Sequence, residues 1–366
     1  MNPYIVAFNF IPQIGYKRLQ KLLEHFGGNY ENILKIPART LSEIAGLKKP
    51  VEYNTSELLK KAEKEIKNCE ALHIKMISVN DNEYPELLKE IPSPPLMLYC
   101  EGNIECLKKH CIAVVGTRNP TTRGYKNAKE LARELTKYDI TIVSGFAAGI
   151  DSAAHKSTID AGGETCAVFG CGIDVTYPKE NENLRKEIPE NGCVVTEFPL
   201  GTSPARTNFP MRNRIIAGLS RACVMVEGTA DSGALITANL AFDMNRSVFA
   251  YPGNIDNERY QGTNKLIKKN IASLITCHND LIDELSHLLE LKHKETNLKE
   301  KIRENPVNLS SLEKKIINLV DSSQLKHIDL LVEESGEAVN TVGQVLLALE
   351  LKGLVIQKPG KLFIRS

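Results

Sequence analysis

The 366-residue sequence predicts an α/β fold: a doubly wound, extended Rossmann-like parallel sheet with a helical N-terminal domain and a C-terminal winged-helix domain. Three observations predict it. Short, almost continuously apolar runs alternate with segments of helical period through the middle of the chain. Residues 1–75 contain only helical patterns. Residues 310–366 combine three helical patterns with one hairpin.

The N-terminal residues 1–75 are expected to form a helix-hairpin-helix or SAM-like domain. FIPQIGYKRLQKLLEHFG places apolar residues at helical spacing after a Pro/Gly turn, and LSEIAGLKK repeats the pattern in shorter form. Such hairpins can hold a DNA phosphate on glycine-rich backbone, but here Gln13 stands where a glycine would allow close approach. A structural or protein-contact role is therefore favoured.

Residues 76–280 are expected to form the Rossmann-like domain. The predicted strands are CIAVVG (111–116), ITIVSG (140–145), TCAVFG (165–170), CVVTEF (193–198), ACVMVEG (222–228), SVFAYPG (247–253) and ASLIT (272–276). Apolar strands separated by helices indicate a parallel sheet that is covered on both faces. Ligands of such sheets bind beyond the carboxyl ends of the strands, so the chemistry is expected in those loops.

The C-terminal part is expected to contain a charged linker and a winged-helix domain. Residues 281–309 are rich in Lys and Glu and poor in apolar residues, which is typical of a linker. In residues 310–366, LVIQKPGKLFIR predicts a hairpin that turns at Pro359 and Gly360. The helix that would read DNA, AVNTVGQVLLALELK, has no cation before Lys352, which favours a protein-contact or regulatory module.

Bulk composition restricts the function only weakly. The 46 Lys and Arg residues nearly balance the 45 Asp and Glu residues, so anion binding has to come from charge placement. Nine cysteines without a CxxC pair, mostly in apolar runs, indicate buried thiols in a cytoplasmic protein. The N-terminus lacks a signal-peptide pattern, which agrees with a cytoplasmic protein. The eight histidines show no metal-ligand spacing, and we expect neither a metal nor a cofactor.

Four loops that follow predicted strands carry cations or small polar residues. Cations follow the first, third and fourth strands: Arg118, Arg123, Lys126, Lys179, Arg206, Arg212 and Arg214. The second strand ends in Ser144 and Gly145 at a helix start. Free amides at helix N-termini and neighbouring arginines both bind phosphate. The sequence therefore predicts a positive pocket at one edge of the sheet. Tyr177 beside Lys179 suits a stacked base and its phosphate.

The segment FPMRNRIIAGLS places two arginines at a predicted helix start near Pro210, where the helix dipole disfavours cations. An anion is expected to compensate them. Because Arg212 and Arg214 are two residues apart, they cannot share one helical face. We expect them to flank a phosphate from two sides, with Asn213 orienting the loop or contacting the ligand itself.

Several enzyme classes fit the sequence poorly. No GxxxxGK[ST] is present, and GCGIDV has only two glycines, so neither a P-loop nor a dinucleotide site is supported. Asp151 and His155 lie four residues apart with Ser144 nearby, but no GxSxG elbow accompanies them. A structural role for these three residues is favoured over a catalytic one.

The central region resembles the DprA/Smf family of DNA-processing proteins. The matching stretches occur in order: YPELLKEIPSPPLMLYCEGN (84–103), VVGTRNPTTRG (114–124), IVSGFAAGIDSAAH (142–155), VFGCGIDVTYPKEN (168–181), FPMRNRIIAGLS (209–220), SGALITANLA (232–241) and VFAYPGN (248–254). Several motifs in order are far more specific than any single glycine pattern.

The resemblance implies a non-catalytic, single-stranded DNA (ssDNA)-binding recombination mediator of natural transformation and competence. It implies a homodimer formed through the Rossmann-like domain, and loading of the RecA recombinase. The DNA-binding residues it implies are Gly116, Arg118, Ser144, Gly145, Lys179, Arg212, Asn213 and Arg214. Most of the affinity would come from phosphates and would fall with salt.

Two alternatives remain open at this point. A nucleotide-processing enzyme of the LOG-like phosphoribohydrolase type would share the layout, but its PGGxGTxxE loop is replaced by VEGTADSGALIT, which keeps only Glu227 and Gly228. A pure protein-interaction scaffold would bind neither DNA nor nucleotides.

Overall fold

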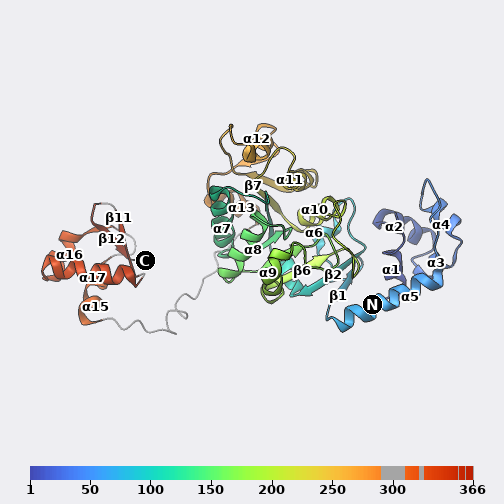
Figure 1. Cartoon of the computed structure of the whole chain (residues 1–366), viewed down its shortest axis with the longest axis horizontal. Helices are drawn as coiled ribbons and strands as arrows, with labels where there is room; N and C mark the ends of the chain where they lie inside the picture. Colours follow the sequence, from blue (N-terminus) through green and yellow to red (C-terminus); the bar gives the residue numbers. More distant parts are fainter. Residues whose placement is uncertain (290–309, 321–324, 353, 359, 366) are drawn as a thin grey trace. The chain divides into compact units, whose positions relative to one another are not determined.

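The computed structural model describes residues 1–289, 310–320, 325–352, 354–358 and 360–365. The chain divides into two compact units, Met1–Glu295 and Thr296–Ser366. Figure 1 colours both units along the sequence. No helix within the described residues is long and apolar enough to cross a membrane.

The first unit begins with five helices. They are α1 (Pro3–Phe8), α2 (Tyr16–His25), α3 (Tyr30–Lys35), α4 (Ala38–Ile44) and α5 (Thr55–Ala71). The turn between α1 and α2 places Gln13 at a φ of 66°, a left-handed conformation that glycine adopts more easily. After α4 the chain turns at Gly46 and forms no helix before Thr55, so the second hairpin lacks its second helix.

A nine-stranded sheet forms the centre of the same unit. Its strands are β1 (Lys75–Ser78), β2 (Met97–Gly102), β3 (Cys111–Gly116), β4 (Thr141–Ser144), β5 (Thr165–Val168), β6 (Gly192–Thr196), β7 (Ala222–Glu227), β8 (Ser247–Ala250) and β9 (Ser273–Leu274). They lie in the order β1-β2-β6-β5-β4-β3-β7-β8-β9. The seven predicted strands are all present and pair in parallel, which confirms the predicted fold class. The sequence reading missed β1 and β2, which extend the sheet in antiparallel fashion next to β6.

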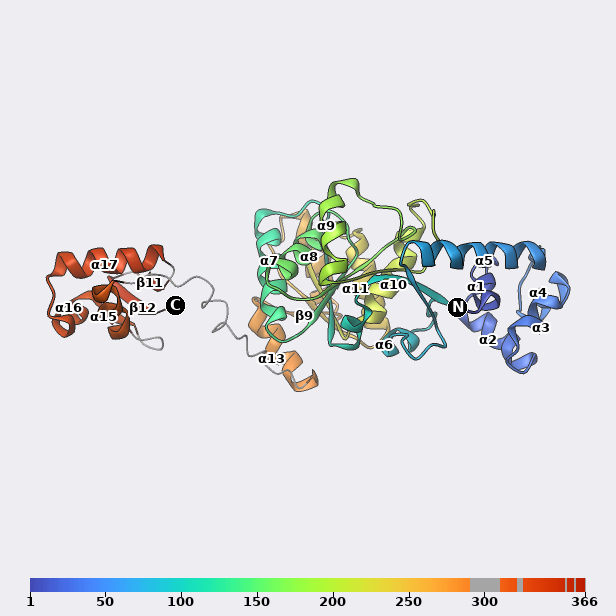
Figure 2. The ribbon, with the colours of Figure 1, turned by 90° about the horizontal axis from the view of Figure 1, so that it is seen from below.

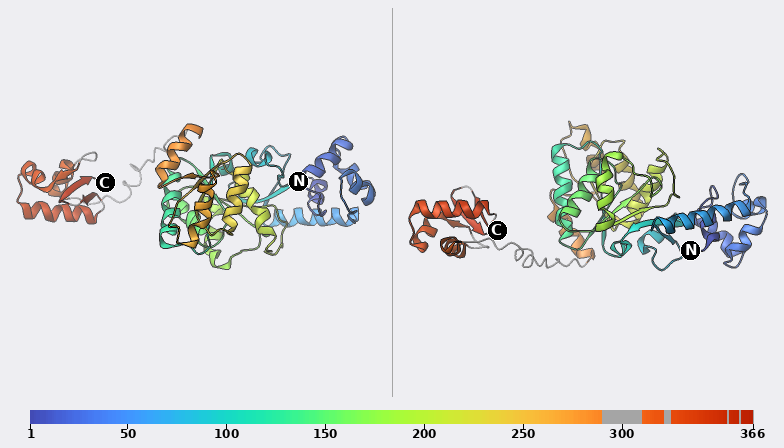
Figure 3. Two further views of the ribbon diagram at one scale, coloured as in Figure 1. Left: turned by 90° about the horizontal axis from the view of Figure 1, so that it is seen from above. Right: turned by 60° about the horizontal axis from the view of Figure 1, so that its bottom comes forward.

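Helices cover both faces of this sheet, as Figures 2 and 3 show. They are α6 (Glu86–Lys89), α7 (Thr122–Thr136), α8 (Ile150–Asp160), α9 (Glu182–Glu187), α10 (Asn208–Leu219), α11 (Gly233–Asp243), α12 (Gln261–Lys268) and α13 (His278–Leu289). Four short 3₁₀ turns complete it: Ile104–Lys108, Lys179–Asn181, Pro189–Asn191 and Glu258–Tyr260. Buried residues of α6, α10, α11 and α12 share one cluster on one face, whereas those of α7, α8 and α13 cluster on the other.

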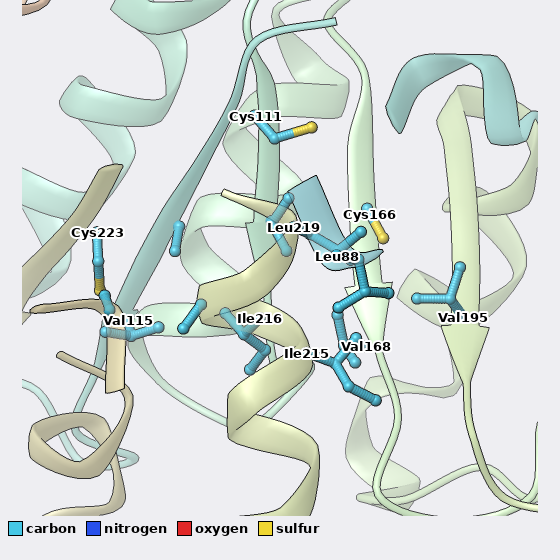
Figure 4. Packing of buried hydrophobic residues seen from close by; sticks show 14 of the residues in the cluster. Leu88, Cys111, Val115, Cys166, Val168, Val195, Ile215, Ile216, Leu219 and Cys223 are labelled. Carbon is cyan, nitrogen blue, oxygen red and sulfur yellow. The ribbon is translucent and has the colours of Figure 1, made fainter. Parts of the chain in front are cut away.

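The core follows from the alternation of side chains along each strand. In β3, Val115 packs in the cluster that contains α10, while Val114 packs in the cluster that contains α7. The side chains on both faces of this strand are therefore buried. Figure 4 shows Ile215, Ile216 and Leu219 of α10 packed over the sheet. Burial of each such side chain contributes about 1.5–3 kcal/mol. All nine cysteines have free thiols, and eight are buried.

The end of the first unit differs from the expected linker. Leu281, Ile282 and Leu285 are buried against the sheet, so residues 281–289 belong to α13 rather than to a solvated segment. Three apolar residues at helical spacing were the signal for this packing. The remainder of the expected linker, residues 290–309, lies outside the described residues.

The second unit is a winged-helix domain. It contains α15 (Ser311–Leu319), β10 (Lys326–His327), α16 (Ile328–Ser335), α17 (Val339–Leu351), β11 (Val355–Lys358) and β12 (Leu362–Arg365). Its strands lie in the order β10-β12-β11. Ile316, Leu331 and Leu346 meet in its core. The expected hairpin turn has Gly360 at a φ of 84°, while Pro359 lies outside the described residues.

Candidate functional site

A cavity of about 310 Å³ opens at the carboxyl ends of β3 and β7. We call it the main cavity. Its lining comprises Val115, Gly116, Thr117, Arg118, Ala147, Asp151, Phe209, Arg212, Asn213, Ile216, Thr229, Ser232, Gly233, Ala234 and Thr237. From β3 the sheet is built outward in both directions, through β4 on one side and β7 on the other. The main cavity therefore occupies the topological switch point, where α/β sheets bind ligands.

Arg212 is the central cation of this cavity, although it is 6% exposed. Its Nη1 donates to the carbonyl oxygens of Gly145 and Val168, which follow β4 and end β5. Its Nε donates to Asn213 Oδ1 at 3.3 Å. Burial lowers the pKa of Arg212 to about 10, against the raising effect of nearby Asp151, so the side chain stays charged at neutral pH. One buried arginine thus links two strand ends to α10.

Asp151 supplies the negative charge next to Arg212. Its Oδ2 accepts from the backbone N–H groups of Gly145 at 3.1 Å and Ala147 at 3.3 Å. Burial raises the pKa of Asp151, while Arg212 and these two N–H groups lower it. The anion that the sequence required beside the arginines is therefore partly provided by the protein itself.

His155, one turn further along α8, is fully buried. Its Nδ1 lies 2.6 Å from Thr165 Oγ1, and that hydroxyl donates to the carbonyl oxygen of Ile142. Nδ1 must therefore carry the proton, which leaves Nε2 without a partner among the described residues. His155 does not line the main cavity.

Arg214 points away from the main cavity. It forms an ion pair with Glu197, and the two side chains are 19% and 13% exposed. α10 begins at Asn208, two residues earlier than expected, so both arginines lie in its second turn. Side chains two residues apart project in different directions there. The structure thus does not bring Arg212 and Arg214 together around one anion.

The other predicted residues are distributed over the cavity wall and its surroundings. Gly116 and Gly145 leave space for close packing: a Cβ on Gly145 would lie 2.7 Å from Arg212 Nη2. Asn213 lines the cavity and donates from Nδ2 to the carbonyl oxygen of Gly233 at 3.2 Å. Ser144 is fully buried: its hydroxyl donates to the carbonyl oxygen of Val114 at 2.6 Å and also lies close to the carboxylate of Asp151.

A second, smaller cavity of about 80 Å³ adjoins the first, and we call it the side cavity. It is lined by Arg118, Gly145, Phe146, Ala147, Ala148, Tyr177, Pro178, Glu180, Phe209 and Arg212. Arg118 and Lys179 are both exposed, but only Arg118 belongs to the lining. The Tyr177 and Phe209 ring centroids are 5.6 Å apart. Arg123, Lys126 and Arg206 are exposed outside both linings.

Glu227 is the last residue of β7 and does not belong to the lining of the main cavity. It is fully buried, and its carboxylate accepts from Thr121 N at 2.9 Å and from Thr121 Oγ1 at 2.7 Å. Thr121 in turn caps α7. Since both contacts fix the loop after β3, Glu227 acts in positioning Arg118. In the part of the chain that the structure describes, no cluster of His, Cys, Asp and Glu is placed to hold a metal.

Several residues of the cavity lining were not predicted from the sequence, among them one aromatic and two hydroxyl residues. Phe209, Thr229 and Ser232 line it, yet none is charged and only Ser232 has a local signal, as the N-cap of α11. Phe209 lies three residues before Arg212 of the RNR motif, but an aromatic residue at a helix start is usually assigned to the hydrophobic core. Its position between two cavities emerges only from the fold.

These features define a doubly wound α/β protein with a polar, cation-lined cavity at the switch point of its sheet. Residues 75–286 match the family described as DNA recombination-mediator protein A, and residues 302–361 match the DprA winged helix domain. The chain therefore belongs to the DprA/Smf family of DNA-processing proteins.

Relatives cover most of the chain. Protein Smf of a Synechocystis species is 35% identical over 99% of this chain and 98% of its own length. DNA processing protein DprA of Streptococcus pneumoniae is 41% identical over 57% of this chain and 73% of its own. A crystal structure of the S. pneumoniae protein superposes with a TM-score of 0.64 at 32% identity, covering 78% of this chain and 98% of that one.

A second solved structure concerns DNA directly. The DNA processing protein A of Helicobacter pylori, described for its ssDNA binding mode, superposes with a TM-score of 0.55 at 29% identity. The match covers 60% of this chain and 97% of that one.

Proposed function

We propose that the chain is a ssDNA-binding recombination mediator that protects incoming strands and promotes RecA loading during DNA uptake in natural transformation. The observation that carries the proposal is the cation-lined cavity at the switch point, with Arg118 exposed at its mouth and Arg212 buried in its wall. The ssDNA binding described for the H. pylori relative supports the same ligand.

Within this proposal the predicted residues have different tasks. Arg118 and Lys179, both exposed, bind phosphates, and Arg212 adds charge from within the wall. Gly116, Gly145 and Asn213 shape the wall. Ser144 and Arg214 support the binding residues from the sheet and from α10. Tyr177 offers an exposed ring for a base.

Arg118 provides the sharpest test because it is exposed and lines both cavities. In filter binding the protein is expected to prefer ssDNA to duplex. Arg118→Ala should weaken binding and reduce the slope of log K against log salt by about 0.7, the value for one phosphate of single-stranded DNA. Arg133→Ala removes an exposed cation of α7 that lines neither cavity. It should leave both the affinity for ssDNA and the salt slope unchanged. Equal affinities for all three proteins would refute the proposal.

The proposed partners are RecA and a second copy of the chain. The proposed location of the protein is the cytoplasm. The homodimer would form through the Rossmann-like domain. Light scattering should give twice the mass of one chain, also for a chain shortened to residues 1–289. RecA loading is measured as ATP hydrolysis by RecA on ssDNA already covered by a single-strand binding protein, which should start earlier when the chain is added.

We propose that the protein is not an enzyme, and that its winged-helix domain contacts other proteins. Glu227, the one glutamate available for a phosphoribohydrolase reaction in the VEGTADSGALIT loop, is occupied by Thr121. Release of free base from nucleoside monophosphates would favour the enzyme instead.

In the winged-helix domain, Val339 and Leu347 are exposed on α17, which carries no cation. Such a helix is poorly suited to duplex DNA.

A further inference from the structure

Asn181 ends the short turn Lys179–Asn181 and precedes α9, but its side chain does not cap that helix. Asparagine at this position usually accepts from the free N–H groups of the first helical turn. Here its Nδ2 donates instead to the carbonyl oxygen of Phe146 at 3.0 Å and to Ser152 Oγ at 2.9 Å. Both N–H bonds of the amide are therefore directed at the loop after β4 and the first turn of α8.

The loop after β4, residues 145–147, forms part of the wall of both cavities. Each of its three carbonyl oxygens accepts from a side chain: Gly145 from Arg212, Phe146 from Asn181 and Ala147 from Ser152. Phe146 is fully buried and has a φ of 61°, a left-handed conformation that residues with a side chain rarely adopt. The shape of this wall therefore depends on side-chain donors. Among these three, Asn181 is the one that belongs to the segment between β5 and α9.

The turn that Asn181 holds also carries Lys179. Lys179 is exposed, and its neighbours in the sequence, Pro178 and Glu180, line the side cavity together with Arg118. Because a lysine side chain is long and flexible, the position of its backbone determines which phosphates it can reach. A turn detached from the wall would leave the charge of Lys179 in solvent, away from Arg118.

We infer that Asn181 is a positioning residue for ssDNA binding. It fixes the Lys179 turn to the loop after β4, so that Lys179 and Arg118 contact phosphates of the same bound strand. This inference rests on the proposed function and deepens it. Asn181 acts through Lys179 and does not itself touch the DNA.

The test is a double-mutant cycle on the full chain with a fluorescent oligothymidylate, read by anisotropy at several salt concentrations. Lys179→Ala should weaken binding about tenfold, as expected for one charge-assisted contact. It should also reduce the slope of log K against log salt by about 0.7. Asn181→Leu removes the amide at similar volume and should weaken binding by a smaller factor. In the background of Lys179→Ala it should have no further effect, because the residue that it positions is already gone.

Two results of this cycle would overturn the inference. One is an unchanged affinity for Asn181→Leu alone. The other is an equal loss with and without Lys179, which would show that Asn181 supports the whole wall rather than Lys179. Asn181→Ser keeps a residue that suits the start of α9 but lacks the amide donors, and it should show the same dependence on Lys179. Agreement of the two variants excludes misfolding as the cause of the Leu result.

Asn191→Leu is the matched control. Asn191 follows α9, is half-buried like Asn181, and donates from Nδ2 to the carbonyl oxygen of Glu187 at 2.9 Å, but it lines neither cavity. It should keep the affinity of the wild type. If Arg118→Ala weakened binding and Lys179→Ala did not, the role of Asn181 would be refuted and the proposed function retained. If neither variant altered binding, both would be refuted.

Discussion

The guanidinium of Arg212 donates to the carbonyl oxygen of Gly145, directly after β4. The same Nη1 reaches the carbonyl oxygen of Val168 at the end of β5. Strand-end carbonyls that point into a cavity need donors, and here a single buried side chain supplies them. Arg212 therefore contributes to the fold as well as to the charge of the cavity.

Replacing Arg212 should destabilise the protein. Arg212→Ala removes the donors to two buried carbonyls and leaves Asp151 without its cation, which together should cost about 3–5 kcal/mol. Urea unfolding of the full chain measures this loss. Arg118→Ala, at an exposed position, should unfold within about 0.5 kcal/mol of the wild type. Similar midpoints for the two variants would show that Arg212 acts only in binding.

The Arg214–Glu197 pair should act on stability rather than on DNA. Both side chains are largely buried, and the second atoms of the pair, Glu197 Oε1 and Arg214 Nη1, have no hydrogen-bond partner among the described residues. Arg214→Ala should therefore destabilise the protein by about 3 kcal/mol, because Glu197 is left buried and unpaired. Arg214→Met combined with Glu197→Leu should restore most of this loss.

The DNA readout separates this role from direct binding. If Arg214 only supports α10, the salt slope of the double variant equals that of the wild type. A slope reduced by about 0.7 would instead show that Arg214 contacts a phosphate.

Gly124 is expected to be intolerant of any side chain. A Cβ at this position in the first turn of α7 would lie 1.9 Å from Glu227 Oε2. Gly124→Ala must therefore displace the carboxylate that holds Thr121, at a cost of about 3 kcal/mol. Gly233→Ala is the control, because its Cβ would meet nothing within 4 Å at the start of α11. Thermal unfolding should separate the two, and an unchanged transition in Gly124→Ala would contradict this packing.

The fold was predictable because its strands are short apolar runs buried on both faces. CIAVVG coincides with β3, and the order of alternating helices determined the parallel sheet. β1 and β2 were missed because their short sequences, KMIS and MLYCEG, lie on either side of a Pro-rich segment. In addition, β2 pairs with β6 from far along the chain, and β1 pairs only with β2. No local period reports such a pairing.

The site was predictable only in part. The sequence located the cations at strand ends, since the carboxyl ends of parallel strands share one edge. Whether a cation faces the cavity depends on its position around the helix, and Arg214, two residues after Arg212, forms an ion pair with Glu197 instead. The roles of Asp151 and Phe209 arise from contacts across loops, which no spacing within the sequence encodes.

His155 should make the stability of the protein depend on pH. Burial, and secondarily the charge of Arg212, lowers the pKa of His155 to about 3 from its ordinary 6.5. Below pH 6.5 the unfolded chain binds a proton that the folded chain refuses. The contribution of His155 to the free energy of unfolding is therefore fully present above pH 6.5. It is lost as the pH falls toward 3, by up to about 1.4 kcal/mol per pH unit.

The variant His155→Gln isolates this contribution. It cannot take up a proton, so its unfolding free energy should fall less steeply between pH 6.5 and 5 than that of the wild type. Asp151, whose pKa is raised by burial, has the opposite sign: its contribution is present at low pH and lost as the pH rises through its folded pKa. Because Asp151 remains in both proteins, the difference between their curves reports His155. Parallel curves from urea unfolding across this range would show that His155 becomes charged without unfolding the protein.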